Sequence, residues 1–190
     1  MSLTATGGKV RSGWLTRING AGHYRALTIY LLVVLAHWIE HFVQAVQIYV
    51  FDVPRPQARG VLGEPFPFLI SSELLHVLYA IYMLVGLALL RRAFSGEART
   101  WWTAALVIQA WHFFEHALLA AQAWTGSNLA GRPVPTSILQ LAIARVETHL
   151  IYNIIVLIPL LTAISLHWFR KDGRNAGTPP CTCATHFVSS

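Results

Sequence analysis

Four long apolar stretches constrain this chain more than any other feature of its sequence. They cover residues 26–49, 68–90, 102–124 and 138–169. Each has about twenty residues or more, which is the length that an α-helix needs to cross a hydrocarbon core about 30 Å thick. Only 12% of the residues are charged, against about a quarter in a typical soluble domain. We therefore predict an all-α integral membrane protein with four transmembrane helices in a bundle.

The basic residues predict how these helices cross the membrane. Ten of the 14 lysines and arginines lie before the first stretch, between the second and third, or after the fourth. The other four are Arg55, Arg59, Arg132 and Arg145. Because cytoplasmic flanks carry the excess of lysine and arginine, we expect both termini in the cytoplasm of a multi-pass protein of the cell membrane. The basic charge then reflects topology, and we expect no nucleic-acid partner.

The sequence repeats itself in two halves. A shift of 75 residues superposes polar residues of the first and third stretches, with His37 on His112, Glu40 on Glu115 and His41 on His116. A shift of 73 does the same for the second and fourth stretches, with His76 on His149 and Tyr79 on Tyr152. We predict two duplicated helical hairpins, 26–95 and 96–170, related by a parallel pseudo-two-fold axis. A cytoplasmic segment, 1–25, precedes them and a flexible cytoplasmic tail, 171–190, follows.

The pattern His-x-x-Glu-His occurs in the first stretch at 37–41 and in the third at 112–116. Helical residues i, i+3 and i+4 share one face, so each motif presents its three polar side chains together. Counted from the outer ends of the stretches, four histidines fall at a similar depth of about 12–16 Å, namely His41, His76, His116 and His149. The first histidine of each motif lies one turn deeper. Ionisable groups at such depth are costly and mark functional sites by default.

We predict that this array of six histidines and two glutamates binds metal, because imidazole and carboxylate are ligands for iron, copper, zinc and manganese. The predicted ligands are His37, Glu40, His41, His76, His112, Glu115, His116 and His149. They can form one dinuclear centre on the pseudo-axis, or two separate three-histidine sites in which the glutamates act as bases or orient the ligands. The candidate catalytic residues are Glu40, Glu115, Tyr79 and Tyr152.

A redox function is favoured, with iron or copper preferred and zinc as a further option. The site is rich in nitrogen ligands, and a tyrosine follows His76 and His149 by three residues. We expect an oxidoreductase that acts on a hydrophobic or lipid-like substrate or on O2. It is similar in design to the membrane oxygenases and desaturases that hold a di-iron pair with histidine boxes, although their HxxHH spacing does not occur here. It acts alone, with a redox partner, or as a subunit of a larger membrane complex.

Three alternatives stay open. Bis-histidine ligation of haem b would make the chain an electron-transfer protein, but the stretches hold one glycine, Gly86, for close approach to a macrocycle. The HxxEH pattern resembles that of the inverzincins, where both histidines bind zinc and the glutamate is the base; a zinc-dependent intramembrane hydrolase would use that chemistry. A metal-free transporter or proton channel would use the same side chains as relays.

Several residues outside the array also carry expectations. Arg145 is expected to pair with Glu73 near the outer mouth of the bundle; binding of an anionic substrate is the alternative. Cys181, Cys183 and His186 in the tail can bind a soft metal such as Cu(I), but reduced cytoplasmic thiols are the simpler expectation. His23 and His167 are assigned as ordinary interfacial residues.

Overall fold

A computed structural model describes residues 13–169 and Cys183. In that part of the chain every regular element is helical. The α-helices are α1 (Trp14–Ile18), α2 (His23–Tyr49), α3 (Phe68–Ser71), α4 (Glu73–Leu90), α5 (Gly96–Thr125) and α6 (Arg145–Trp168). Short 3-10 turns are η1 (Arg55–Gln57), η2 (Arg91–Ala93), η3 (Leu129–Gly131) and η4 (Leu139–Leu141).

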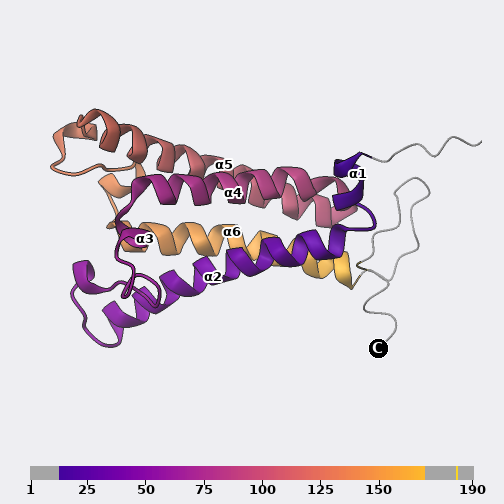
Figure 1. Ribbon diagram of the computed structural model, residues 1–190, viewed down its shortest axis with the longest axis horizontal. Coiled ribbons are helices and arrows are strands. Elements are labelled where there is room, and N and C mark those ends of the chain that lie inside the picture. The colour runs from indigo at the N-terminus through magenta and orange to yellow at the C-terminus, as the bar shows by residue number, and fades with distance from the viewer. Residues whose placement is uncertain (1–12, 170–182, 184–190) are drawn as a thin grey trace, which may run out of the picture.

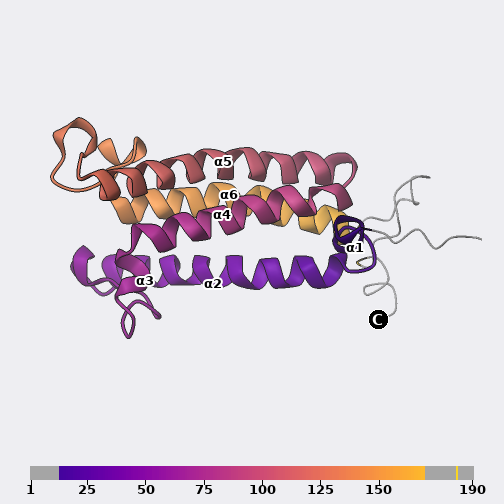
Figure 2. The ribbon, with the colours of Figure 1, turned by 45° about the horizontal axis from the view of Figure 1, so that its top comes forward.

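Helices α2, α4, α5 and α6 are long and apolar enough to cross a membrane. They lie side by side as an elongated bundle (Figure 1), and α2 stands somewhat apart from the other three in the second view (Figure 2). The connections α2–α4 and α5–α6 lie at one end, here called the loop end. Helix α1, the turn η2 and the end of α6 lie at the other, the terminal end. The prediction of an all-helical protein with four potential membrane spans is confirmed.

Two of the predicted stretches are broken at the loop end. The stretch 68–90 divides at Ser72 into α3 and α4, because the Ser72 backbone is extended and its side chain accepts a hydrogen bond from the Leu75 amide as the N-cap of α4. The stretch 138–169 begins with η4, and α6 starts only at Arg145. Residues 138–144 of the fourth predicted stretch are therefore not part of its long helix.

The terminal half of the bundle holds the apolar core. The Trp102 indole N–H donates to the Leu87 carbonyl at 2.6 Å, and its ring stacks on Phe94 with centroids 4.0 Å apart. Tyr30 lies against Gly86, where an added Cβ would overlap the phenol ring. The single glycine of the apolar stretches thus lets α2 approach α4.

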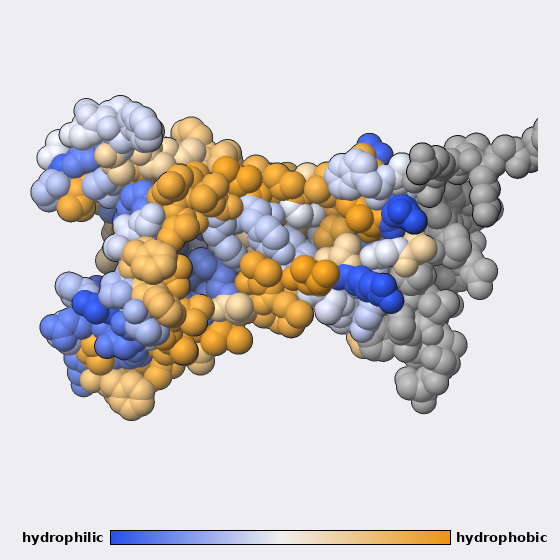
Figure 3. All heavy atoms as spheres, viewed as in Figure 1, coloured by the Kyte–Doolittle hydropathy of each residue, from blue (hydrophilic) through white to orange (hydrophobic). Residues whose placement is uncertain are grey.

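The sides of the bundle are apolar at its surface. Large side chains such as Ile29, Leu32 and Val107 are each more than 60% exposed. In Figure 3 hydrophobic side chains cover most of the bundle's side and hydrophilic ones gather at the loop end. An exposed apolar surface of this extent fits contact with lipid. Of the predicted flanking segments, 1–25 is described from residue 13 and 171–190 only at Cys183.

Candidate metal centre

Six histidine side chains from the four long helices meet in the loop-end half of the bundle, and are called the histidine cluster below. They are His37 and His41 of α2, His76 of α4, His112 and His116 of α5, and His149 of α6. Neighbouring rings have centroids 4.5 to 6.0 Å apart and form one connected group. The structure thus brings together all six histidines that the sequence singled out.

Two pairs of imidazole nitrogens face each other at close range. Nε2 of His41 lies 3.1 Å from Nε2 of His37, one turn away on α2. Nε2 of His116 lies 3.2 Å from Nε2 of His112 on α5. Two nitrogen ligands of one ion, each about 2.1 Å from it, lie about 3.0–3.4 Å apart at right or tetrahedral angles. The two pairs therefore have the spacing of ligands that share an ion, and they also have the spacing of an N–H···N hydrogen bond.

Hydrogen bonds fix the other ring nitrogen of three histidines. Nδ1 of His76 lies 2.8 Å from the Ser72 carbonyl oxygen, and Nδ1 of His149 lies 2.7 Å from the Arg145 carbonyl oxygen. A carbonyl oxygen only accepts, so each Nδ1 carries the proton and each Nε2 keeps a lone pair. His41 Nδ1 contacts Gln44 Oε1 at 2.7 Å in the same sense. Hydrogen bonds of this kind, from the nitrogen that does not bind the metal, orient the histidines of metal sites in proteins.

Several polar atoms of the cluster are buried without a hydrogen-bond partner. They are Nε2 of His149 and Nδ1 of His112 and His116. An unpartnered buried nitrogen costs about 1–3 kcal/mol, and calls for water, an ion or a proton to satisfy it. A cavity of ≈ 10 Å³, about the size of one water, borders His112, His116 and His149.

Ring stacking joins the two halves of the chain. His41 of α2 stacks on His149 of α6 with centroids 5.1 Å apart. His76 of α4 stacks on His116 of α5 at 5.7 Å. These two pairs correspond under the shifts of 75 and 73 residues found in the sequence. By this correspondence we group the six histidines into two matched triplets, each drawn from both hairpins: residues 37, 41 and 149, and residues 112, 116 and 76. The triplets are in contact, since the His149 ring also lies 5.2 Å from that of His116.

Glu40 holds the α2–α4 connection. Its carboxylate accepts hydrogen bonds of 2.9–3.0 Å from the backbone amides of Val61, Leu62 and Gly63. Gly60 precedes them with φ +74°, and a Cβ there would overlap the carboxylate. Since Glu40 lies nine residues before the end of α2, the connection folds back about 13 Å along the helix.

Glu115 does the same for the α5–α6 connection. Its carboxylate accepts from Ser137 Oγ at 2.9 Å and from the Leu139 amide at 2.9 Å. Both glutamates lie beside the histidine cluster, as predicted, but their described hydrogen bonds go to the loops. Gln47 and Gln122 follow the same pattern, with contacts to Gly60 and to Thr136.

The two predicted tyrosines stack on the deeper histidines. Tyr79 lies 3.7 Å from His37, centroid to centroid, and Tyr152 lies 4.2 Å from His112. Both tyrosines line a cavity of ≈ 20 Å³ just inward of the cluster, together with Asn153. This space is large enough for a molecule about the size of water or O2.

Two ion pairs surround the loop-end mouth. Arg145 forms a two-pronged pair with Glu73 at 2.6 and 2.9 Å, which confirms the pairing expected from the sequence. Glu147 accepts from Arg55 at 2.6 Å and from the Tyr49 hydroxyl at 2.6 Å. The hydrogen bond to Glu147 raises the pKa of Arg55. These pairs tie α4 to α6 and the first connection to α6.

The depth of the α4 and α6 histidines differs from that expected. His149 lies four residues from the start of α6, and His76 lies three from the start of α4, because both helices begin late. The motifs on α2 and α5 sit eight or nine residues from the helix ends. Helices α2 and α5 thus extend further beyond the cluster than α4 and α6 do. The two connections fold back along them to reach the starts of α4 and α6.

A further group of possible ligands joins Cys183, which the sequence grouped with Cys181 and His186, to two histidines that were assigned as interfacial residues. Among the described residues, three potential ligand atoms lie mutually within 4.8 Å at His23, His167 and Cys183, whereas the nitrogens of the histidine cluster approach in pairs. The three residues come from distant parts of the chain and share no spacing that a motif could reveal.

No protein-family model, curated protein or solved structure matches this chain.

Proposed function

We propose that the chain is a multi-pass membrane metalloprotein whose histidine cluster binds one or two transition-metal ions for redox chemistry. The observation that carries the proposal is the facing pair of Nε2 atoms on α2 and its counterpart on α5, at 3.1 and 3.2 Å. Six imidazoles in one connected group within a membrane bundle indicate a functional site, because buried polar groups there are costly unless paired.

Each matched triplet supplies ligands for one ion. In the first triplet, His149 supports the pair on α2 through its stacked ring and its proton-bearing Nδ1. His76 supports the pair on α5 in the same way. Because the nitrogens now approach in pairs, binding requires the third imidazole of each triplet to turn its Nε2 toward the pair. The proposed site is therefore two three-histidine sites in contact.

The glutamates are assigned to the loops in this proposal. The charge of Glu40 is already compensated by three backbone amides, and that of Glu115 by a hydroxyl and an amide. They orient the loops that close the loop end over the cluster. This arrangement favours three-histidine sites over a carboxylate-bridged centre.

Iron or copper fits this all-nitrogen surrounding and would supply one-electron and O2 chemistry. Tyr79 and Tyr152 stack directly on His37 and His112, so an electron can pass between a phenol and a ligand without crossing a gap. The ≈ 20 Å³ cavity beside them admits a reactant no larger than about O2 or water. A hydrophobic substrate would approach through the apolar sides of the bundle.

Haem and zinc hydrolysis fit less well. The rings contact one another directly, which leaves no slot for a macrocycle between opposed histidines. A hydrolase would need Glu40 or Glu115 as a general base, and both are engaged with the loops.

A metal-free proton relay is the second candidate. The 3.1 and 3.2 Å contacts also fit N–H···N hydrogen bonds, and the connected rings offer successive proton carriers.

The proposal includes a duplication of the helical hairpin and an orientation of the bundle in the membrane. Identical contacts recur at the two shifts: the Nε2 pairs, the tyrosine stacks and the Nδ1 bonds to a carbonyl four residues earlier. Common origin of the two hairpins accounts for this recurrence. The basic flanks support an orientation with the terminal end in the cytoplasm. A redox partner or larger membrane complex would contact the exposed surfaces.

Elemental analysis and the absorption spectrum of the protein purified in mild detergent test the function. Iron or copper at one to two equivalents per chain supports it. A Soret band would replace it with haem binding, zinc alone would favour hydrolysis, and a folded protein that binds no metal would favour the proton relay.

A further inference from the structure

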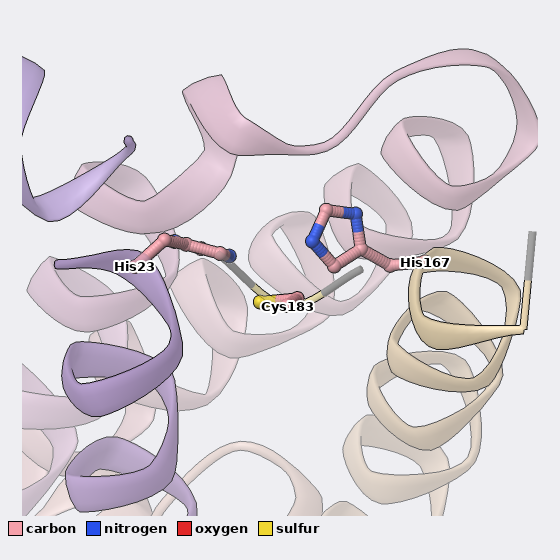
Figure 4. A group of neighbouring side chains, drawn as sticks. All are labelled: His23, His167 and Cys183. Atoms are coloured by element: carbon pink, nitrogen blue, oxygen red, sulfur yellow. The ribbon is translucent and has the colours of Figure 1, made fainter. Parts of the chain in front are cut away.

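We propose a second metal site at the terminal end of the bundle, formed by His23, His167 and Cys183 and suited to a thiophilic d10 ion, Zn²⁺ or Cu⁺. One ligand atom from each residue lies within 4.8 Å of the other two. Figure 4 shows the three side chains turned toward a common point, from the start of α2, the end of α6 and the C-terminal segment.

The ligand types are those that such ions select. A thiolate with two imidazoles binds Zn²⁺ or Cu⁺, whereas Mg²⁺ and Ca²⁺ prefer oxygen. Nδ1 of His23 lies 3.0 Å from the Ile18 carbonyl oxygen. The carbonyl only accepts, so Nδ1 carries the proton and Nε2 presents its lone pair as a ligand.

Two of the three side chains are buried. His23 is fully buried and Cys183 is 1% exposed. The two imidazoles lie edge to face with centroids 5.3 Å apart, and the Phe94 ring contacts both, at 5.6 and 4.6 Å. The low exposure of Cys183 reduces the access of oxidants to its thiol.

The site is separate from the histidine cluster. His23 lies 14 residues before His37 on the same helix, or about 21 Å along its axis. An ion here would link segments that are 144 residues apart at His23 and His167, and would fix the C-terminal segment at Cys183. With the terminal end in the cytoplasm, the thiol stays reduced and available as a ligand.

Cobalt substitution of the full-length protein in detergent tests the site. Co²⁺ reports thiolate ligation through a near-ultraviolet sulfur-to-metal charge-transfer band. We expect one such band in the wild type, its loss in Cys183→Ser, and its retention in Cys181→Ser, the matched control two residues away. A competition titration with Cu⁺ should show binding weaker by about tenfold or more in Cys183→Ser than in the wild type, and no such change in Cys181→Ser.

His167→Gln supplies a second test, because this half-buried residue is the ligand whose replacement disturbs the core least. It should shift or abolish the band while the helical circular dichroism is unchanged. Absence of the band from the wild type, its persistence in Cys183→Ser or His167→Gln, or its equal loss in Cys181→Ser would overturn the proposal. His41→Ala and His116→Ala should leave the band unchanged, so failure of this site and failure of the histidine cluster are distinguishable.

Discussion

The imidazole of His41 on α2 stacks on that of His149 on α6, with ring planes 28° apart. This contact links the first of the four long helices to the last, and its counterpart links α4 to α5 through His76 and His116. A metal bound by either triplet would therefore be held by both hairpins. Metal binding and the packing of the two halves are consequently coupled, since an ion that binds only the folded bundle stabilises it.

Replacing a histidine of either pair should weaken metal binding. His41→Ala and His116→Ala each remove one Nε2 from a pair, so each should lower affinity by about tenfold or more. Competition titration with the metal found in the wild type measures the change. Phe42→Ala is the matched control, because Phe42 is half exposed beside His41. Equal affinity in the wild type and both histidine variants would exclude these side chains as ligands.

Glu40→Gln should release the first loop while leaving the metal bound. The substitution replaces charge-assisted hydrogen bonds to Val61, Leu62 and Gly63 with weaker neutral ones. The local stability of the loop should fall by about 1–2 kcal/mol. Hydrogen exchange at residues 61–63 should then quicken by about tenfold, with metal content unchanged. Glu64→Gln, in the same loop and exposed, should alter neither. Loss of metal in Glu40→Gln would make Glu40 a ligand instead.

Gly60→Ala should disturb the same contact by a steric route. The added Cβ would overlap the Glu40 carboxylate, and φ is +74°. Gly131→Ala matches the backbone strain, with φ +66°, but meets nothing within 4 Å. We expect Gly60→Ala to cost about 1–3 kcal/mol more than Gly131→Ala in the free energy of unfolding. Similar costs for the two variants would mean that the loop does not close on Glu40.

Gly86→Ala should destabilise the terminal half of the bundle. Its Cβ would overlap the Tyr30 ring between α2 and α4, and overpacking of a core costs about 1–3 kcal/mol. Denaturant unfolding in detergent, followed by circular dichroism, measures the change. Gly13→Ala is the control, because that position has negative φ and open space around it. An unchanged midpoint for Gly86→Ala would contradict the close approach of the two helices.

The sequence predicted the four helices and the meeting of the six histidines because both depend on local periodicity. Apolar runs of about twenty residues specify spans, and the i, i+3, i+4 spacing puts His37 and His41 on one face. The break at Ser72 was not predicted, since the polar run of Ser71, Ser72 and Glu73 is short and lies inside an otherwise apolar stretch. It arises from a serine cap and from the loop that folds back onto Glu40.

The contacts of the two glutamates with the loops could not be predicted from the sequence either. Glu40 and Glu115 occupy the motif position expected of a ligand or base, yet their partners are backbone amides and a hydroxyl more than 20 residues away. Such contacts depend on the path of the loops, which has no periodic signature. The same reason explains why His23 and His167 were assigned as interfacial residues, because Cys183 reaches them from a separate segment.

X-ray absorption spectroscopy of metal-loaded Cys183→Ser protein tests the central claim most directly. This variant removes the sulfur ligand of the terminal site and leaves the histidine cluster intact. We predict a first shell of nitrogen at about 2.0–2.1 Å, with the outer-shell scattering of imidazole and about three histidines per ion. A shell of oxygen without imidazole scattering, or a folded protein that retains no metal, would contradict the account.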